Sequence, residues 1–245
     1  MTNIAIIFAG GSGQRMRRTE SSLPKQFLEI NGKPIIVYTL ELFQKHPEID
    51  KVYIAINPKY MDLMKDLVKH YYLDKVCGIT NGGDTGQDSI YKVLKLAQSE
   101  NSDDSIVLIH DGVRPNITPE VISKNIECAK ANGNAITCTN CYETILISEN
   151  HINPKHVPAR KNTYAAQAPQ TFHLGEVVAA HEFIRPINPE YTDIVDTCTL
   201  FRVLGKETFM VEGNRGNLKV TTIEDLYILR AYIHMKEDAA AYGLK

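Results

Sequence analysis

The chain has 245 residues, 43% apolar and 23% charged, which is enough for one large domain with a full hydrophobic core. Its net charge of −2 argues against a dedicated nucleic-acid-binding protein, and no apolar run approaches the length that crosses a membrane. The five scattered cysteines indicate reduced thiols, and because no secretory signal peptide is visible we expect a cytoplasmic protein.

The first predicted element is a buried strand over residues 4–8, which runs into a glycine-rich loop. A short continuous apolar run is typical of a buried parallel strand. The loop that follows contains Gly10, Gly11 and Gly13. Glycines allow a tight turn in which successive backbone N–H groups converge on a phosphate. Arg15 and Lys25 add two cations at the exit of the loop, so this region predicts a triphosphate site that also stabilises charge during group transfer.

Other interpretations of this loop fit less well. The dinucleotide-binding fingerprint needs a third glycine where Met16 stands, and the Lys-Ser/Thr ending of a P-loop is absent. A plain turn with surface charges explains the glycines alone about as well as a phosphate site does. Arg15 and the segment Pro24-Lys-Gln-Phe27 shift the balance toward the phosphate site.

Strands and helices alternate over the next hundred residues. The predicted strands are residues 52–56, 76–79 and 106–109. The predicted helices begin at Pro34, at Asn57-Pro58, near Asp88 and at Thr118-Pro119. This alternation predicts an α/β fold, a Rossmann-like and mostly parallel sheet with helices on both faces. The loops at 10–16, 81–89 and 110–115 each follow a strand, so they should share the ligand-binding edge of the sheet.

Residues 134–170 depart from this alternation. Residues 136–139 and 144–148 have the composition of strands, and several prolines follow without a helical period. We expect one domain over residues 1–245 with a protruding β-arm at about 138–168. Such an arm cannot bury both of its faces alone, so it predicts pairing with a second subunit. Beyond the arm, the pattern predicts helices over 174–184 and 196–204, a strand over 208–211 and a capping box at 221–225 that opens the final helix.

The segment His110-Asp-Gly-Val-Arg-Pro115 places a carboxylate at the end of a buried strand. Asp111, above a phosphate loop, is suited to hold Mg²⁺ together with triphosphate oxygens. The alternative is that Asp111 caps a turn and pairs with Arg114. Lys219 is a second informative position, because a lysine at the edge of an apolar strand needs an anion to satisfy it.

Ordered motifs along essentially the whole chain resemble those of the sugar nucleotidyltransferase superfamily, and within it the cytidylyltransferases that act on methylerythritol phosphate or ribitol phosphate. The motifs are Ala9-Gly-Gly-Ser-Gly-Gln-Arg-Met16 with Pro24-Lys-Gln-Phe27, Gly82-Gly-Asp-Thr-Gly-Gln-Asp-Ser89, His110-Asp-Gly-Val-Arg-Pro115 and Asn217-Leu-Lys-Val-Thr-Thr222. The resemblance implies the nucleotidyltransferase fold, a homodimer joined by the arm, Mg²⁺ as cofactor, and CTP and a polyol phosphate as substrates.

The resemblance also implies roles for particular residues. Arg15, Lys25 and Lys219 would be catalytic cations. The nucleotide would be held by Ala9, Gly10, Gly11, Gly13, Gly83, Ser89 and Asp111, with Asp111 also the Mg²⁺ ligand. The acceptor would be held by Thr144, Arg160 and Asp196. Helix capping is an equally good explanation of Asp196, and Asp88 or Ser89 could cap the helix that is predicted to begin near Asp88.

Three features resemble the ribitol phosphate branch: Gly112-Val113 in the third motif, Asp196-Thr-Cys198, and Gln170-Thr-Phe172. From this resemblance we expect D-ribitol 5-phosphate as the acceptor. The product would then be CDP-ribitol, used for a cell-surface polymer such as teichoic acid or capsule. The alternative acceptor is 2-C-methyl-D-erythritol 4-phosphate, in isoprenoid synthesis. Gly86 stands where the family has an arginine, and Ala168 where it has a threonine. A nicotinamide-dependent oxidoreductase and an inactive binding module are other classes, which the glycine pattern and the retained charged residues disfavour.

Overall fold

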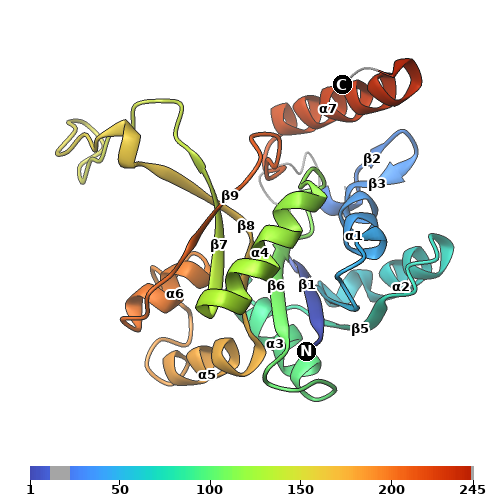
Figure 1. Ribbon diagram of the computed structural model, residues 1–245, viewed down its shortest axis with the longest axis horizontal. Helices are drawn as coiled ribbons and strands as arrows, with labels where there is room; N and C mark the ends of the chain where they lie inside the picture. Colours follow the sequence, from blue (N-terminus) through green and yellow to red (C-terminus); the bar gives the residue numbers. More distant parts are fainter. Residues whose placement is uncertain (12–22, 244–245) are drawn as a thin grey trace.

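The computed structural model describes residues 1–11 and 23–243, and within them a seven-stranded sheet forms the centre of the molecule (Figure 1). The strand order is β5-β4-β1-β6-β8-β7-β9. The strands are β1 (Asn3–Ala9), β4 (Lys51–Ile56), β5 (Val76–Asn81), β6 (Ile106–Asp111), β7 (Asn134–Asn140), β8 (Tyr164–His173) and β9 (Met210–Glu212). A separate two-stranded hairpin consists of β2 (Glu29–Ile30) and β3 (Lys33–Pro34).

The helices connect these strands. They are α1 (Ile35–Lys45), α2 (Met61–His70), α3 (Gly86–Gln98), α4 (Pro119–Asn132), α5 (Leu174–Ile184), α6 (Thr197–Val203) and α7 (Ile223–Tyr242). Short 3-10 turns are η2 (Lys25–Phe27), η3 (Pro58–Tyr60) and η4 (Arg160–Asn162). No helix in these two stretches of the chain is long and apolar enough to cross a membrane.

The sheet is mostly parallel, as predicted. The neighbours β5, β4, β1 and β6 run parallel, and β9 is parallel to β7. Only β8 runs against its neighbours β6 and β7. Strand β8 has no clear sequence signal and was not predicted, because Gln167, Pro169 and Gln170 interrupt its apolar pattern; its first three residues are exposed. Its buried second half nevertheless completes the sheet.

Two hydrophobic clusters lie on the two faces of the sheet. In β1, Ala5 and Ile7 join the cluster formed with α1, α2 and α4, whereas Ile4 and Ile6 join the cluster formed with α3, α5 and α6. Because side chains alternate along a strand, an unbroken apolar run supplies both faces. The predicted covering of both faces by helices is therefore confirmed.

Most helix starts agree with the predicted capping residues. Asn57 caps η3 by accepting a hydrogen bond from the Lys59 N–H, and the capping box of α7 uses Thr222 and Asp225. The prediction for α3 was wrong in detail. The helix begins at Gly86, and its cap is the Thr85 hydroxyl, which accepts from the Asp88 N–H at 3.0 Å, rather than Asp88 or Ser89.

Between β7 and β8 the chain leaves the sheet and projects from the body as an arm, residues 141–163 (Figure 1). The predicted strand over 144–148 is wrong, since the arm contains one isolated bridge, Ile147 to His156, and the short turn η4. The apolar side chains there have no second layer to cover them. Those exposed are Tyr142, Ile145, Leu146, Ile147, Ile152 and Val157.

Candidate active site

A cavity of about 650 Å³ opens at the carboxyl-terminal edge of the parallel strands. It gathers the loops after β1, β5 and β6 with η2 and the segment before α7. The predicted residues that line it are Ala9, Gly10, Gly11, Lys25, Gly83, Ser89, Asp111 and Lys219. For the described residues of the three loops, the expectation that they share one edge of the sheet is therefore confirmed. Two other predicted residues, Gly13 and Arg15, lie outside the described residues.

The start of the first loop lies close to the loop after β5. A Cβ atom on Gly10 would be only 2.8 Å from the Ser89 hydroxyl, so a larger residue would separate the two loops. Gln26 ties the first loop to η2, because its side-chain amide donates to the carbonyl oxygens of Ala9 at 2.8 Å and Gly11 at 3.3 Å. Gln26 lies in the Pro-Lys-Gln segment but was not assigned a role, as the sequence does not show its buried position against the loop.

Ser89 organises the second loop. Its hydroxyl accepts from the Gly83 N–H at 2.9 Å and donates to the Thr85 carbonyl at 3.0 Å. The Asp88 carboxylate lies directly against Gly83, where an added Cβ would stand 1.8 Å from the carboxylate oxygen. Position 83 therefore requires glycine as long as Asp88 keeps this place. Asp84 and Thr85, which the sequence analysis did not single out, also line the cavity.

Asp111 meets two cations at the end of β6. Its carboxylate accepts from Arg114 Nε at 2.7 Å and from Lys219 Nζ at 2.6 Å, one cation on each oxygen. Burial acts to raise the pKa of this carboxyl, but the charges of Lys219 and Arg114 outweigh burial and hold the pKa below its ordinary value. The predicted alternative of an Asp111–Arg114 pair is present in the structure.

Lys219 lies in an irregular segment before α7 and not in a strand, so that part of the prediction is wrong. The segment is held by Val220, whose N–H donates to the Val113 carbonyl at 3.0 Å, and by Arg114, whose guanidinium donates to the Asn217 carbonyl at 2.8 Å. The anion that Lys219 requires is supplied within the chain by Asp111. Its side chain remains 42% exposed, which leaves the ammonium accessible from the cavity.

His110 supports the turn that carries Asp111. The imidazole is fully buried, packs edge-on against Phe43, and its Nε2 lies 3.1 Å from the Arg114 carbonyl. Burial lowers the pKa of His110 to about 4, so the ring is neutral at pH 7 and donates through Nε2. The sequence showed His110 within the motif but not its part in closing the turn.

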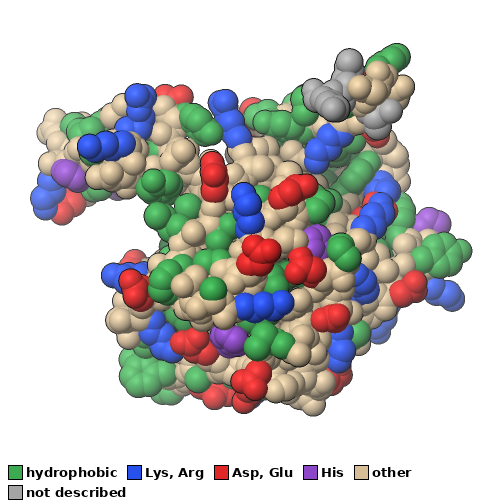
Figure 2. Space-filling view, in the orientation of Figure 1, with side chains coloured by type: hydrophobic (Ala, Val, Ile, Leu, Met, Phe, Trp, Pro, Cys, Tyr) green, Lys and Arg blue, Asp and Glu red, His purple; other side chains and the backbone are tan. Residues whose placement is uncertain are grey.

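The three predicted acceptor residues lie away from this cavity. Thr144 and Arg160 are exposed on the arm, whose surface carries Lys and Arg side chains interspersed with acidic and apolar ones (Figure 2). Asp196 caps α6: its carboxylate accepts from the N–H of Thr199 at 2.7 Å and from the side-chain amide of Gln170 at 2.7 Å. Capping, one of the two explanations of Asp196, is thus observed, and a single chain does not bring these residues to the nucleotide loops.

The carboxylates at the cavity could bind a hard cation such as Mg²⁺ only if the substrate supplied further ligands. Among the described residues no group of three or more His, Cys, Asp or Glu side chains could by itself hold a metal ion. Asp111 offers one carboxylate beside the phosphate loop, which is the type of site where Mg²⁺ is shared between a carboxylate and substrate phosphates. The donor set therefore fits a metal that arrives with a triphosphate.

Comparisons of the sequence with known proteins identify its family. Residues 3–235 match the family described as 2-C-methyl-D-erythritol 4-phosphate cytidylyltransferase, IspD. The chain is 40% identical to a ribitol-5-phosphate cytidylyltransferase of Streptococcus agalactiae serotype V over the full length of both. It is 36% identical to a 2-C-methyl-D-erythritol 4-phosphate cytidylyltransferase of Clostridium botulinum, covering 92% of this chain and 95% of that protein.

Solved structures show the same fold. A 4-diphosphocytidyl-2C-methyl-D-erythritol synthase from Anaerococcus prevotii superposes with a TM-score of 0.79 at 28% identity, over 95% of this chain and 96% of that one. A 2-C-methyl-D-erythritol 4-phosphate cytidylyltransferase from Francisella tularensis gives 0.77 at 29% identity, over 94% and 98%. The chain therefore belongs to the 2-C-methyl-D-erythritol 4-phosphate cytidylyltransferase family and is a nucleotidyltransferase that uses CTP.

Proposed function

We propose that this enzyme transfers the cytidylyl group of CTP to D-ribitol 5-phosphate, giving CDP-ribitol and pyrophosphate. The observation that carries the proposal is the cavity in which the glycine loop, Lys25, Asp111 and Lys219 converge. The acceptor assignment rests on similarity, since ribitol-5-phosphate cytidylyltransferases at 38–40% identity match the chain over 98–100% of its length. The methylerythritol phosphate enzyme of Clostridium botulinum is 36% identical over 92% of the chain.

The transfer is a single displacement at phosphorus. A phosphate oxygen of the acceptor forms a bond to the α-phosphorus of CTP, and the bond from that phosphorus to the β-bridging oxygen breaks, so pyrophosphate leaves with the bonding electrons. The acceptor phosphate is already an anion, so no activated side-chain nucleophile is required. The enzyme then contributes position and charge stabilisation. Lys25 and Lys219 reach the cavity from two different segments and would hold the negative charge that grows on the triphosphate. Arg15 would add a third cation.

The nucleotide would lie along the two loops that Ser89 and Gly10 bring together. Backbone N–H groups of residues 9–11 would bind phosphate oxygens, and Gly83 with Ser89 would hold the cytosine edge. Gln26 keeps the first loop in place, because its amide bridges two loop carbonyls. These contacts bind the ground state and orient the α-phosphorus for in-line attack.

Mg²⁺ would be held by Asp111 together with triphosphate oxygens. When bound, the ion would neutralise and orient the triphosphate. Lys219, which pairs with the same carboxylate, would add a positive charge beside the phosphates.

The acceptor site would be completed by a second subunit. Thr144 and Arg160 lie on the exposed arm, and Arg160 is suited to two-point recognition of a phosphate. The exposed apolar side chains of the arm would be covered in a homodimer, which would place each arm beside the partner's cavity. We further propose that the enzyme works in the cytoplasm and supplies CDP-ribitol for a cell-surface polymer such as teichoic acid or capsule.

The test is pyrophosphate release in the presence of Mg²⁺, with each of the four ribonucleoside triphosphates and each acceptor tried separately. Release that requires both CTP and ribitol 5-phosphate supports the proposal. Release with CTP and 2-C-methyl-D-erythritol 4-phosphate alone would replace the acceptor, and release without CTP would reject the nucleotide assignment.

A further inference from the structure

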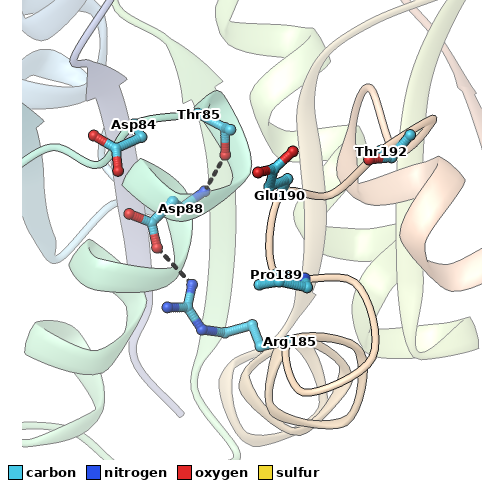
Figure 3. Close-up of a pocket in the computed structure, with 7 residues that line it drawn as sticks. All are labelled: Asp84, Thr85, Asp88, Arg185, Pro189, Glu190 and Thr192. Carbon is cyan, nitrogen blue, oxygen red and sulfur yellow. Dashed lines mark hydrogen bonds and ion pairs between the residues drawn. The ribbon is translucent and has the colours of Figure 1, made fainter.

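A second cavity, of about 410 Å³, adjoins the nucleotide cavity (Figure 3). Asp84 and Thr85 line both cavities, so the loop before α3 is the wall between them. The far side of the second cavity comes from the end of α5 and the segment after it, where Arg185, Glu190 and Thr192 are found. Figure 3 shows the Arg185 side chain reaching across to Asp88.

Arg185 forms an ion pair with Asp88. Its Nη1 lies 2.5 Å from Asp88 Oδ1, while Lys92 lies 3.1 Å from Oδ2. The guanidinium also lies over the Tyr91 ring at 4.3 Å. Burial acts to raise the pKa of Asp88, yet hydrogen bonds from Arg185 and Lys92 hold it below the ordinary value, so Asp88 is an anion at neutral pH.

Asp88 connects the ion pair with Arg185 to the loop over residues 83–89. Its carboxylate is packed on Gly83, whose N–H is bound by the Ser89 hydroxyl next to Asp88. A displacement of the carboxylate would therefore open space at Gly83 and loosen the segment that lines the nucleotide cavity. Among the described residues two cations meet Asp88: Lys92 lies one turn along α3 itself, whereas Arg185 comes from the C-terminal cap of α5. Gly86 contributes no side chain to this turn.

We propose that Arg185 is a positioning residue for CTP: it holds Asp88 against Gly83 and so keeps the loop over residues 83–89 in its nucleotide-binding form. The proposal rests on the function proposed above, in which this loop binds the cytosine. Arg185 does not line the nucleotide cavity, so its effect passes through Asp88. The cost of its loss should appear in CTP affinity and not in the chemical step.

The structure provides a matched control on the same two helices. Lys95 of α3 pairs with Glu182 of α5 at 3.0 Å, almost two turns along α3 from Asp88. Its side chain is 44% exposed, against 34% for Arg185. A Lys95→Met variant removes an ion pair between α3 and α5 without touching the 83–89 loop.

CTP binding by calorimetry and steady-state kinetics would be measured for Arg185→Met, Arg185→Lys and Lys95→Met. Because a charge-assisted contact is lost, Arg185→Met should raise both the Kd and the KM for CTP about tenfold. The kcat of Arg185→Met and its KM for the acceptor should stay near the wild-type values. Arg185→Lys should recover part of the CTP affinity. Lys95→Met should bind CTP with the wild-type affinity. Unchanged CTP affinity in Arg185→Met, or an equal loss in Lys95→Met, would overturn the proposal.

Hydrogen exchange of the ligand-free protein separates this inference from the proposed function. Arg185→Met should speed amide exchange in residues 82–89 about tenfold relative to wild type and to Lys95→Met, because the loop opens more readily. Exchange that is unchanged in this segment would reject the positioning role even if the wild type uses CTP. Faster exchange in an enzyme that does not bind CTP would instead reject the proposed function alone.

Discussion

In the proposed mechanism, the chemistry of the cavity depends on the charged pair of Asp111 and Lys219. Their contact at 2.6 Å joins the end of β6 to the segment before α7, and Arg114 holds the other carboxylate oxygen. In the proposed mechanism, this pair holds the Lys219 ammonium at the cavity that would receive the triphosphate. The ammonium therefore needs little reorganisation to stabilise a developing charge.

Lys219→Ala should lower kcat by about 10²–10³-fold, because a cation that stabilises the transition state is lost. Lys206→Ala is the control, as Lys206 pairs with Glu176 away from the cavity. Steady-state pyrophosphate release would measure both. A Lys219→Ala enzyme with the turnover of the Lys206→Ala control would show that Lys219 is not part of the mechanism.

His181 makes stability depend on pH. Burial lowers the pKa of His181 to about 3, against an ordinary value of 6.5 in the unfolded chain. Between these pH values the unfolded chain binds a proton at this position and the folded chain does not, so stability falls as the pH falls through this window.

From pH 7.5 to pH 4.5 the wild type should lose about 2 to 3 kcal/mol more free energy of unfolding than His181→Gln, which cannot take up this proton. Urea unfolding at both pH values would measure the difference. Equal losses in the two proteins would mean that His181 titrates normally in the folded state.

The site residues that sequence predicts best are those with a distinctive chemical type in a motif. Asp111, Lys25 and Lys219 could be chosen because charged side chains beside apolar strands and glycine loops require an explanation. The roles of Gln26 and His110 could not, since Gln26 binds a loop 17 residues earlier in the chain and His110 is buried against Phe43. The pairing of Asp111 with Lys219 likewise joins residues 108 positions apart, which no local pattern reveals.

The helix α6 begins at a cap that carries three hydrogen bonds to the Asp196 carboxylate, two from Thr199 and one from Gln170. Asp196→Ala should therefore lower the free energy of unfolding by about 1 to 2 kcal/mol, as loss of a helix cap does. Val195→Ala, at the exposed neighbouring position, should leave stability unchanged. Chemical denaturation of both variants gives the answer, and equal stability of Asp196→Ala and wild type would contradict the capping role.

Helices and parallel strands were predictable because each has a local signal. The predicted helix over residues 174–184 coincides with α5, and the capping box places the start of α7. The projecting arm was predicted, but strand β8 and the irregular conformation of residues 144–148 were not, because their conformation is set by neighbours. β8 pairs with two strands despite its polar residues, while residues 144–148 have strand-forming side chains but only one bridge to pair with. Side-chain propensity alone does not distinguish these two cases.

The arm and the cavity belong to one functional unit only if two chains associate. In the proposed dimer, Arg160 from one chain serves the cavity of the other. Co-expression of Lys219→Ala with Arg160→Ala should then restore activity, because each mixed dimer has one cavity with Lys219 that receives an arm with Arg160. About a quarter of wild-type activity is expected from random pairing, since half the dimers are mixed and each has one intact site. Activity no higher than that of the separate variants would show that the arm serves its own chain.

Association itself should depend on the apolar side chains of the arm. Leu146→Asp with Ile147→Asp should shift the protein from a dimer to a monomer in sedimentation equilibrium, because the substitutions place charges in the buried contact. Ile187→Asp, at an exposed position outside the arm, is the control and should remain dimeric. A dimer that survives the arm substitutions would place the interface elsewhere.

The choice of acceptor is the central claim, and competition tests it most directly. Wild-type enzyme would receive limiting CTP, Mg²⁺ and equal concentrations of ribitol 5-phosphate and 2-C-methyl-D-erythritol 4-phosphate, and the cytidine diphosphate products would be identified by mass spectrometry. The account predicts CDP-ribitol as the dominant product. Dominant formation of 4-diphosphocytidyl-2-C-methyl-D-erythritol would contradict it.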